Sequence, residues 1–249
     1  MQAMGTMDEL ELAAARVDLA AAFRLAVRMD LHEGVCNHFS VMLPDGKHFL
    51  LNRYGLHWSE VKAANLLLLD ADGNVLQGEG EFEKTAFHIH SRIHLANVRA
   101  ACVLHTHMPY ATALTLLENA RLEMVEQNAL RFYDDIAYDA TYNGLVVDNA
   151  EGDRLARVLG DKRVMFLANH GVIVAGPSVA EAFDLLYYLE RACRLQVLAR
   201  STGGTFKSIR KEVVRETCRM MRADAPKYAA AHFGALKRIL DREEPDYSH

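Results

Sequence analysis

Histidine is the residue type whose number and spacing most clearly indicate chemistry in this sequence. Ten of the twelve histidines fall between His32 and His170. His105 and His107 are expected at a strand end, where residues i and i+2 project to the same face, and His170 is expected at the end of another strand. Three imidazoles suit zinc and similar divalent ions, and a catalytic site leaves a fourth position for water or substrate. Spacing alone leaves a second interpretation open, in which these are half-buried strand histidines bonded to the backbone.

A second histidine pair, His90 and His94, has the i, i+4 spacing of two ligands on one face of a helix. The same spacing occurs in zinc proteases, but there a glutamate follows the first histidine, whereas here Ser91 does. The sequence therefore disfavours a protease. The alternative interpretation is that one histidine lines a cleft while the other packs between helix and sheet.

The elements that would position these histidines alternate between helices and short strands. Apolar residues at three- and four-residue spacing predict a helix over residues 9–31. Turn residues such as Pro44-Asp45-Gly46 between apolar runs predict hairpins. Ser59 is expected to cap a short helix that ends near Asn65, and Thr85 to cap a longer one. The predicted hairpins cover 39–43 with 47–51 and 66–69 with 74–77, followed by a helix over 85–97, a strand over 100–107 and a helix over 109–118.

The second half of the chain continues this mixture. Two strands are expected on either side of the turn Asn169-His170-Gly171, over 164–167 and 171–175, after a short helix over 152–159. A capping box from Ser178 to Glu181 opens a long helix. Ser201 to Gly204 is the best linker, and two helical stretches are expected beyond it, over 208–222 and 226–241. Hairpins mixed with helices indicate a mixed or antiparallel sheet covered by helices.

Composition sets the class of protein. The chain has 249 residues, 51% of them hydrophobic and 24% charged, which is typical of a globular protein and excludes disorder. A net charge of −5 does not favour nucleic acid as a partner. No apolar run approaches the ~18 residues of a membrane span, and Met1 to Leu12 lacks signal-peptide features. Four scattered cysteines indicate reduced thiols, so we expect a cytoplasmic protein.

A family resemblance connects these motifs. From Leu12 to Arg200 the sequence resembles class II aldolases and the head domain of adducin, and the tail after Gly204 resembles the bacterial adducin-like branch. The resemblance implies an α/β fold, a three-layer α/β/α sandwich with a central mixed, largely antiparallel sheet. It implies one domain over 1–204 and a helical tail over 205–249 that belongs to the same fold or to an oligomer interface. The motifs are Asn37-His38-Phe39-Ser40, Asn52 to Trp58, Asp70 to Gly78, His90 with His94, His105-Thr106-His107, Asn169-His170-Gly171, Phe233 to Leu236 and Pro245 to Tyr247.

The resemblance also implies a metal centre. Its metal ligands correspond to His105, His107 and His170, which would hold one divalent ion, with zinc the first choice and manganese or iron as alternatives. The family further implies a small-molecule substrate and a homotetramer with active sites at subunit boundaries. Tyr138 lies near the position of a proton-donating tyrosine from a neighbouring subunit, and Tyr133 and Tyr142 are rivals for that role.

Departures from the family pattern bear on the reaction. Where the aldolases have Ser-Ser-Glu, with the serines on the substrate phosphate and the glutamate as acid/base, this chain has Lys84-Thr85-Ala86. Glu83 could replace the lost carboxylate if its loop is shifted. The aldolase phosphate loop is altered too, so an unphosphorylated substrate is expected. The expected substrate-binding residues are Asn37, Ser40, Lys84, Thr85 and His90.

The expected function is a metal-dependent lyase, an aldolase or decarboxylase, that cleaves a carbon–carbon bond of a small hydroxy or oxo acid through a metal-stabilised enolate. Glu83 and Tyr138 are its expected catalytic residues. Two alternatives remain at this stage: an iron-dependent oxygenase of the same branch, and a non-catalytic adducin-like assembly domain.

Overall fold

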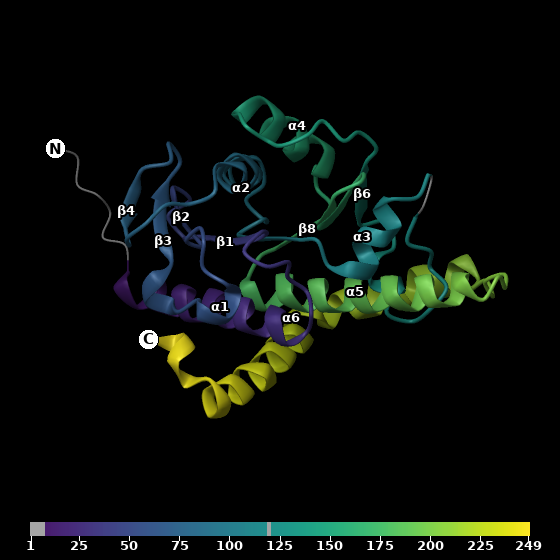
Figure 1. The fold of residues 1–249 in the computed structure, drawn as a ribbon. Coiled ribbons are helices and arrows are strands. Elements are labelled where there is room, and N and C mark those ends of the chain that lie inside the picture. Colours follow the sequence, from purple (N-terminus) through teal and green to yellow (C-terminus); the bar gives the residue numbers. More distant parts are fainter. Residues whose placement is uncertain (1–7, 119–120) are drawn as a thin grey trace.

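A single mixed sheet organises the protein in the computed structural model, which describes residues 8–118 and 121–249 (Figure 1). The first seven residues, part of the segment expected to lack a signal peptide, lie outside this description. The sheet has eight strands in the order β4-β3-β2-β1-β5-β8-β7-β6. All neighbours pair antiparallel except β6 and β7, which are parallel. The strands are β1 (His38–Met42), β2 (His48–Leu51), β3 (Leu67–Asp70), β4 (Val75–Gln77), β5 (Cys102–Thr106), β6 (Ile136–Asp139), β7 (Val164–Leu167) and β8 (Gly171–Gly176).

Helices cover both faces of this sheet, as Figure 1 shows. One face carries α2 and α4, and the other carries α1, α3, α5 and α6. The three-layer α/β/α sandwich with a largely antiparallel sheet is thereby confirmed. The helices are α1 (Glu9–Arg28), α2 (Lys84–Ala96), α3 (Pro109–Thr115), α4 (Asn149–Leu159), α5 (Val179–Ser201) and α6 (Lys211–Glu243), and 3-10 turns occupy Trp58–Glu60, Ala63–Asn65, Ala129–Phe132 and Pro245–Ser248.

The side chains of the central strands alternate between two cores. Phe39 and Leu104 face α1 and α5, where Phe23, Trp58 and Phe183 fill the larger core. Residues of the opposite parity, such as Val103 and Ile173, pack against α2 and α4. His38 and His105 have this second parity and are direct partners across β1 and β5, so both lie under the α2 layer.

One strand was not predicted, and two local expectations were wrong. At Ile136–Asp139, a segment for which no element was predicted, β6 pairs with β7 in the parallel ladder of the described sheet. The turn at Trp58–Glu60 is capped by His57, whose Nδ1 accepts from the backbone N–H of Ser59, so Ser59 is not the cap. Thr85 does not cap the helix over the expected 85–97, because α2 already begins at Lys84 and Thr85 donates its hydroxyl hydrogen to Glu83.

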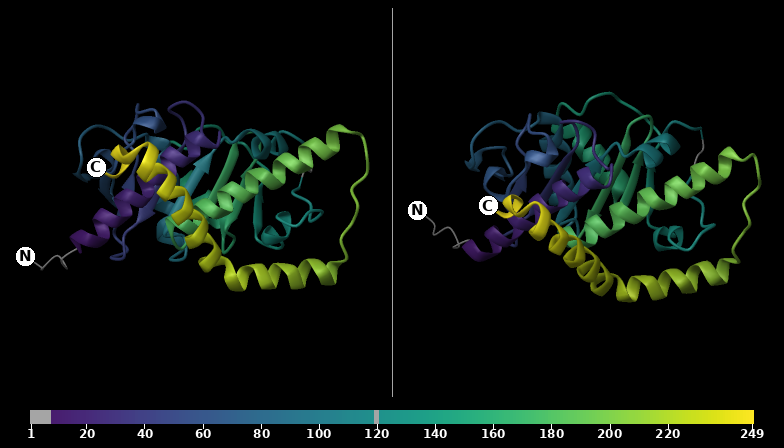
Figure 2. Two further views of the ribbon diagram at one scale, coloured as in Figure 1. Left: turned by 90° about the horizontal axis from the view of Figure 1, so that it is seen from below. Right: turned by 60° about the horizontal axis from the view of Figure 1, so that its bottom comes forward.

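The tail after the linker also differs from expectation. It forms a single helix, α6, with Pro226 in its interior instead of two separate stretches. Proline removes one backbone donor and crowds the preceding turn, which bends a helix without ending it when the flanking turns pack well. Figure 2 shows the bend in α6 and its C-terminal half crossing α5 towards α1. Phe233, Leu240 and Tyr247 are buried in the larger core, so this half packs on its own subunit.

Candidate metal centre

Three imidazoles converge where β5 ends and β7 turns into β8. His105 is the penultimate residue of β5, His107 follows that strand, and His170 lies in the turn before β8. Ligand nitrogens of these three residues all lie within 4.8 Å of one another. Among the residues that the structure describes, this is the one group of three or more metal-ligating side chains found at such distances.

Hydrogen bonds orient two of these rings. His105 Nδ1 lies 3.0 Å from the carbonyl oxygen of Val172, which can only accept, so Nδ1 carries the hydrogen. His107 Nδ1 lies 2.5 Å from Glu33 Oε2, and a carboxylate likewise accepts. In the neutral rings both Nε2 atoms therefore present lone pairs to each other across 3.1 Å. A cation beside both nitrogens resolves this repulsion, and the carbonyl and carboxylate partners are those that metal-binding histidines use. The donor set fits a divalent ion.

Close packing of the backbone brings His170 to the other two histidines. Its ring centroid lies 4.8 Å from that of His105 and 4.7 Å from that of His107. A Cβ at Gly171 would come within 2.6 Å of the Thr106 carbonyl oxygen, so only glycine permits this approach of the two strand ends. Burial lowers the pKa of His170 to about 4 and holds that of His105 well below its usual range. Both rings are consequently neutral at pH 7, which is the form that binds metal.

A cavity of about 280 Å³ opens over the histidines. Its lining mixes the three imidazoles with His38, Glu83 and Thr85, and its outer wall includes the exposed Tyr142, whose ring centroid is 6.2 Å from that of His170. No lysine or arginine is found among its described lining residues. The lining residues are Val35, Cys36, Asn37, His38, Tyr54, Glu83, Thr85, Ile89, His105, His107, Tyr142, Gly144, Leu145, Val146 and His170.

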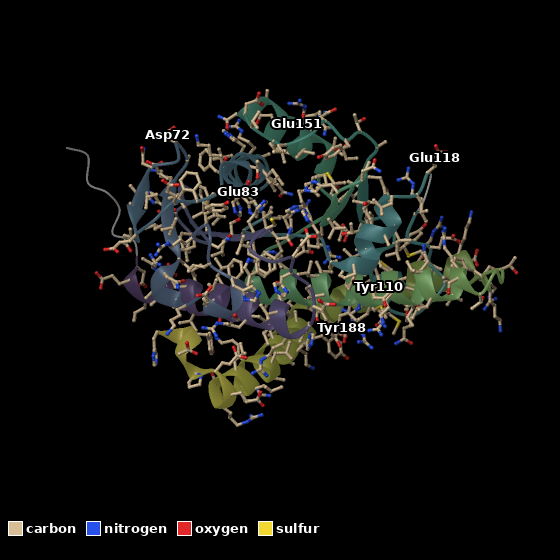
Figure 3. All side chains as sticks on the ribbon, viewed as in Figure 1. Asp72, Glu83, Tyr110, Glu118, Glu151 and Tyr188 are labelled. Atoms are coloured by element: carbon tan, nitrogen blue, oxygen red, sulfur yellow. The ribbon has the colours of Figure 1, made fainter. Side chains whose placement is uncertain are left out.

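Glu83 and its neighbours bring polar groups into this cavity. Glu83 lies at the start of α2, on the side of the sheet that α2 covers (Figure 3). Its Oε2 lies 3.6 Å from His38 Nε2, and its Oε1 accepts from the Thr85 hydroxyl. Asn37 adopts a left-handed backbone with φ 78° and accepts from the backbone N–H of His107 at 3.2 Å. The expected residues Asn37, Glu83 and Thr85 thus share the cavity with the three histidines.

Ser40 and His90 lie behind the cavity wall and do not line it. His90 Nε2 lies 2.7 Å from His38 Nδ1, and the Ser40 hydroxyl lies between His90 Nδ1 and His94 Nε2. Burial holds the pKa of His90 well below its usual range and lowers that of His94 to about 4. The expectation of direct substrate contact for Ser40 and His90 does not match this placement, because His38 separates both from the cavity.

Three other expected positions lie away from the cavity. Lys84 is exposed on the first turn of α2 and is not part of the lining. Ala86, at the place of the family glutamate, faces a buried apolar cluster with Phe49 and Phe87. Tyr138 lines a separate cavity of about 600 Å³, where its hydroxyl accepts from the backbone N–H of Leu122.

Sequence reasoning missed two residues of the centre. Glu33, on His107, stands in the loop after α1, and no pattern in the sequence connects it to that histidine. His38 lies within the motif Asn37-His38-Phe39-Ser40, and its residue type and spacing alone do not connect it to the other histidines. Pairing of β1 with β5 places it opposite His105, with ring centroids 4.7 Å apart. A correct prediction that β1 pairs with β5 would have identified His38 as a neighbour of His105.

Comparison with known proteins agrees with this fold and site. Residues 17–197 match the family model described as Class II Aldolase and Adducin N-terminal domain. An adducin-related protein of Schizosaccharomyces pombe is 31% identical over 95% of this chain and 77% of its own length. Mouse alpha-adducin is 32% identical over 76% of this chain but only 26% of its own length.

Solved structures give the same result. An aldolase II superfamily protein from Pseudomonas syringae superposes with a TM-score of 0.90 at 34% identity, and 96% of each chain is covered. L-fuculose 1-phosphate aldolase from Glaciozyma antarctica PI12 has a TM-score of 0.84 at 24% identity, covering 99% of this chain and 96% of its own, which shows a shared fold. A mixed sheet covered by helices on both faces is thus shared with these aldolase-superfamily structures. The chain belongs to the family of class II aldolase and adducin N-terminal domains.

None of the helices in the described residues is both long and apolar enough to cross a membrane.

Proposed function

We propose that this protein is a metal-dependent lyase that cleaves a carbon–carbon bond of a small, unphosphorylated hydroxy or oxo acid. The observation that carries the proposal is the convergence of His105, His107 and His170 at one cavity, with two Nε2 lone pairs aimed at each other. In the described residues no fourth metal-ligating side chain joins the group, which leaves a position for a substrate oxygen.

Each residue of the centre has a task in this proposal. A divalent ion, with zinc the first choice and manganese or iron as alternatives, would supply Lewis-acid stabilisation of the negative charge that develops on a substrate oxygen. Val172 and Glu33 hold His105 and His107 in the tautomer that presents Nε2. Glu83 offers a carboxylate at the cavity wall, and the apolar Ile89 and Val146 are also part of the lining.

Charge supports an unphosphorylated substrate. A phosphate group is usually bound by arginine, lysine or a helix N-terminus. The described lining of the cavity contains neither basic residue, and the helix N-terminus that borders it carries the carboxylate of Glu83, which repels an anion. Lys84, at the place of a family phosphate-binding serine, is exposed outside the cavity. A volume of about 280 Å³ also suits a small ligand.

Decarboxylation is the favoured reaction within this class. The position of the family acid/base is Ala86, whose side chain packs among apolar residues. Loss of carbon dioxide does not need a base to remove a hydroxyl proton, whereas retro-aldol cleavage does. Among the described residues of the cavity lining, Glu83 is the one carboxylate, and we assign it to retro-aldol cleavage if that reaction is observed.

Assembly completes the proposal. We place the enzyme in the cytoplasm as a homotetramer, in which Tyr138 approaches the cavity of a neighbouring subunit. Tyr138 does not line the cavity of its own chain, and burial raises the pKa of its phenol. Tyr142 is the rival proton donor, because it lines the cavity within a single chain.

The test begins with metal content. Purified protein is dialysed, loaded with zinc, manganese or iron, and measured by elemental analysis beside two variants. His107→Ala removes a ligand, whereas His88→Ala removes a half-buried histidine that contacts Asn149 on α4, outside the centre. We expect one ion per chain in the wild type and in His88→Ala, and less than about one tenth of that occupancy in His107→Ala.

The loaded proteins are then incubated with small 2-hydroxy, 2-oxo and hydroxy-aromatic acids. Products are followed by NMR and by release of carbon dioxide, and oxygen uptake is recorded in parallel. Metal-dependent formation of carbon dioxide or of an aldehyde supports the lyase. Oxygen uptake coupled to product formation would replace it with an oxygenase. Metal-free protein that binds partner proteins without turnover would favour an adducin-like assembly role.

A further inference from the structure

A continuous series of hydrogen bonds runs from the backbone just before β5 to the cavity wall. It begins at the carbonyl oxygen of Ala100, which lies 2.6 Å from His94 Nδ1. His94 Nε2 lies 2.7 Å from the Ser40 hydroxyl, and that hydroxyl contacts His90 Nδ1 at 2.5 Å. His90 Nε2 in turn lies 2.7 Å from His38 Nδ1.

The carbonyl oxygen of Ala100 determines where the hydrogen lies on every side chain that follows in this series of hydrogen bonds. A carbonyl can only accept, so His94 donates from Nδ1 and, as a neutral ring, accepts at Nε2. The Ser40 hydroxyl must then donate to His94 and accept from His90 Nδ1. His90 is left with a bare Nε2, which accepts from His38 Nδ1.

Burial supports the neutral rings that this assignment needs. Ser40 and His90 are completely buried, and His38 and His94 are each 4% exposed. A charged imidazole at His90 or His94 would lose its hydration without gaining a carboxylate partner. Each side chain in this series of hydrogen bonds therefore donates to the group before it, in the direction of Ala100.

The free end of the chain faces the cavity. His38 Nε2 lies 3.6 Å from Glu83 Oε2, which is too long for a hydrogen bond, and both atoms are acceptors in this arrangement. A hydroxyl group of a ligand could donate its hydrogen to either of these two acceptors, so this part of the cavity suits a ligand that has a hydroxyl group. The three convergent histidines lie in the same cavity, so a ligand bound there by an oxygen would bring an adjacent hydroxyl towards His38.

We propose that His94, Ser40 and His90 are positioning residues that hold His38 in its Nδ1–H tautomer, and that His38 Nε2 selects substrates by accepting a hydrogen bond from a hydroxyl group. The substrate class is a 2-hydroxy acid with a carbonyl group at C3, because loss of carbon dioxide leaves charge that a substrate oxygen can carry only next to a carbonyl. The selection of a substrate rests on the proposed function, whereas the tautomer is a property of the metal-free protein.

The tautomer is measured by long-range hydrogen–nitrogen correlation NMR of the imidazole rings in metal-free protein. The His38 signals are assigned from their loss in His38→Phe. We expect hydrogen on Nδ1 and a bare Nε2 in the wild type. Hydrogen on Nε2 of His38 in the wild type would overturn the proposal, whatever the activity of the enzyme.

Two serine variants test whether the series of hydrogen bonds sets the tautomer of His38. Ser40→Ala removes the link, so His38 is free to place its hydrogen on Nε2 and donate to Glu83; we expect the tautomer to reverse. Ser91→Ala is the matched control, because Ser91 is also buried, adjoins His90 and has a hydroxyl without a partner. It should leave the His38 signals unchanged. An unchanged His38 tautomer in folded Ser40→Ala would overturn the positioning role.

A pair of probes tests hydroxyl selection. Glycolate and methoxyacetate can both bind zinc through a carboxylate and an adjacent oxygen, but only glycolate has a hydroxyl hydrogen. Calorimetry on zinc-loaded wild type should show a preference for glycolate of about tenfold, since a bound ligand without a donor leaves a buried acceptor unpaired. In His38→Phe the preference should disappear. A preference that persists in this variant would overturn the assignment of the acceptor.

Zinc affinity in His38→Phe separates this role from metal binding. Phenylalanine retains a ring that can stack on His105 but has no ligand nitrogen. The affinity should stay within about threefold of wild type, because even the loss of an outer hydrogen-bond partner of a ligand typically costs ~10-fold or more. A larger loss would make His38 part of the metal-binding group and overturn the proposal.

Discussion

Glu33 offers a sharp test of the metal centre, because it forms a hydrogen bond to His107 without lining the cavity itself. Its Oε2 lies 2.5 Å from His107 Nδ1, and this contact holds the hydrogen on Nδ1 and the lone pair on Nε2. Glu33→Gln keeps a side chain of the same length, with an amide oxygen that can still accept. It removes the negative charge that makes the imidazole a stronger ligand.

The structure sets the expected size of the effect. Loss of an outer hydrogen-bond partner typically weakens metal binding by ~10- to 100-fold. The Glu33 side chain is 63% exposed, so water screens its charge and the loss should lie at the lower end of that range. We expect zinc affinity to fall about tenfold, equivalent to ~1.4 kcal/mol of binding free energy. Unfolding of the metal-free protein by urea should change little.

The assay is competition with a chromophoric zinc chelator at pH 7.5. Glu212→Gln is the matched control, because it makes the same charge change at an exposed site on α6, which contributes no residue to the cavity lining. Its zinc affinity should equal that of wild type. An affinity within twofold of wild type for Glu33→Gln would refute the reasoning, since His107 would then not need its carboxylate partner.

Three further outcomes follow from the packing around the centre and the C-terminus. Gly171→Ala should lower both the zinc affinity and the free energy of unfolding, because the new Cβ would lie 2.6 Å from the Thr106 carbonyl oxygen. The loss of stability in thermal unfolding should be ~2–3 kcal/mol. An unchanged Tm would contradict this prediction. The free energy of unfolding of metal-free protein should fall as pH decreases from 6.5 towards 4. The unfolded state takes up a proton on each histidine near its ordinary pKa, whereas burial lowers the pKa of His94 to about 4 in the folded state, a difference of ~3 kcal/mol for this residue. A flat urea stability profile between pH 6.5 and 5 would exclude neutral buried histidines. Arg24→Ala should cost ~3 kcal/mol, because this buried guanidinium lies 3.1 Å from Glu244 and joins α1 to the C-terminal turn. Arg219→Ala, which breaks only an exposed pair, is its control in the same melting experiment and should leave the melting temperature unchanged.

Local patterns in the sequence were sufficient for most of the architecture. Apolar periodicity predicted α1 and the long helix α5, and turn residues predicted both hairpins, because these signals depend on near neighbours in the chain. The short β6 escaped prediction, since its pairing with β7 depends on a segment far along the sequence. Pro226 was misread as a boundary because packing against α5 and α1, which the local sequence does not contain, keeps α6 continuous through it.

In the candidate site, too, some features could be predicted from the local sequence, whereas others depend on the packing of distant segments. His105, His107 and His170 stood out in the sequence because ends of strands and a tight turn are local features, and the structure brings the three together. The family resemblance predicted a lyase and placed Ala86 where the aldolases have their catalytic glutamate. In the structure the position of Ala86 on α2 directs its side chain into an apolar cluster and not into the cavity. Residues such as Glu33 and His38 acquire their roles only when segments distant in sequence pack side by side. The sequence by itself therefore determined which side chains could bind a metal, and the tertiary structure decided which groups orient them. Hydrogen bonds across the sheet depend on strand pairing and helix register, and these are consequences of the whole fold.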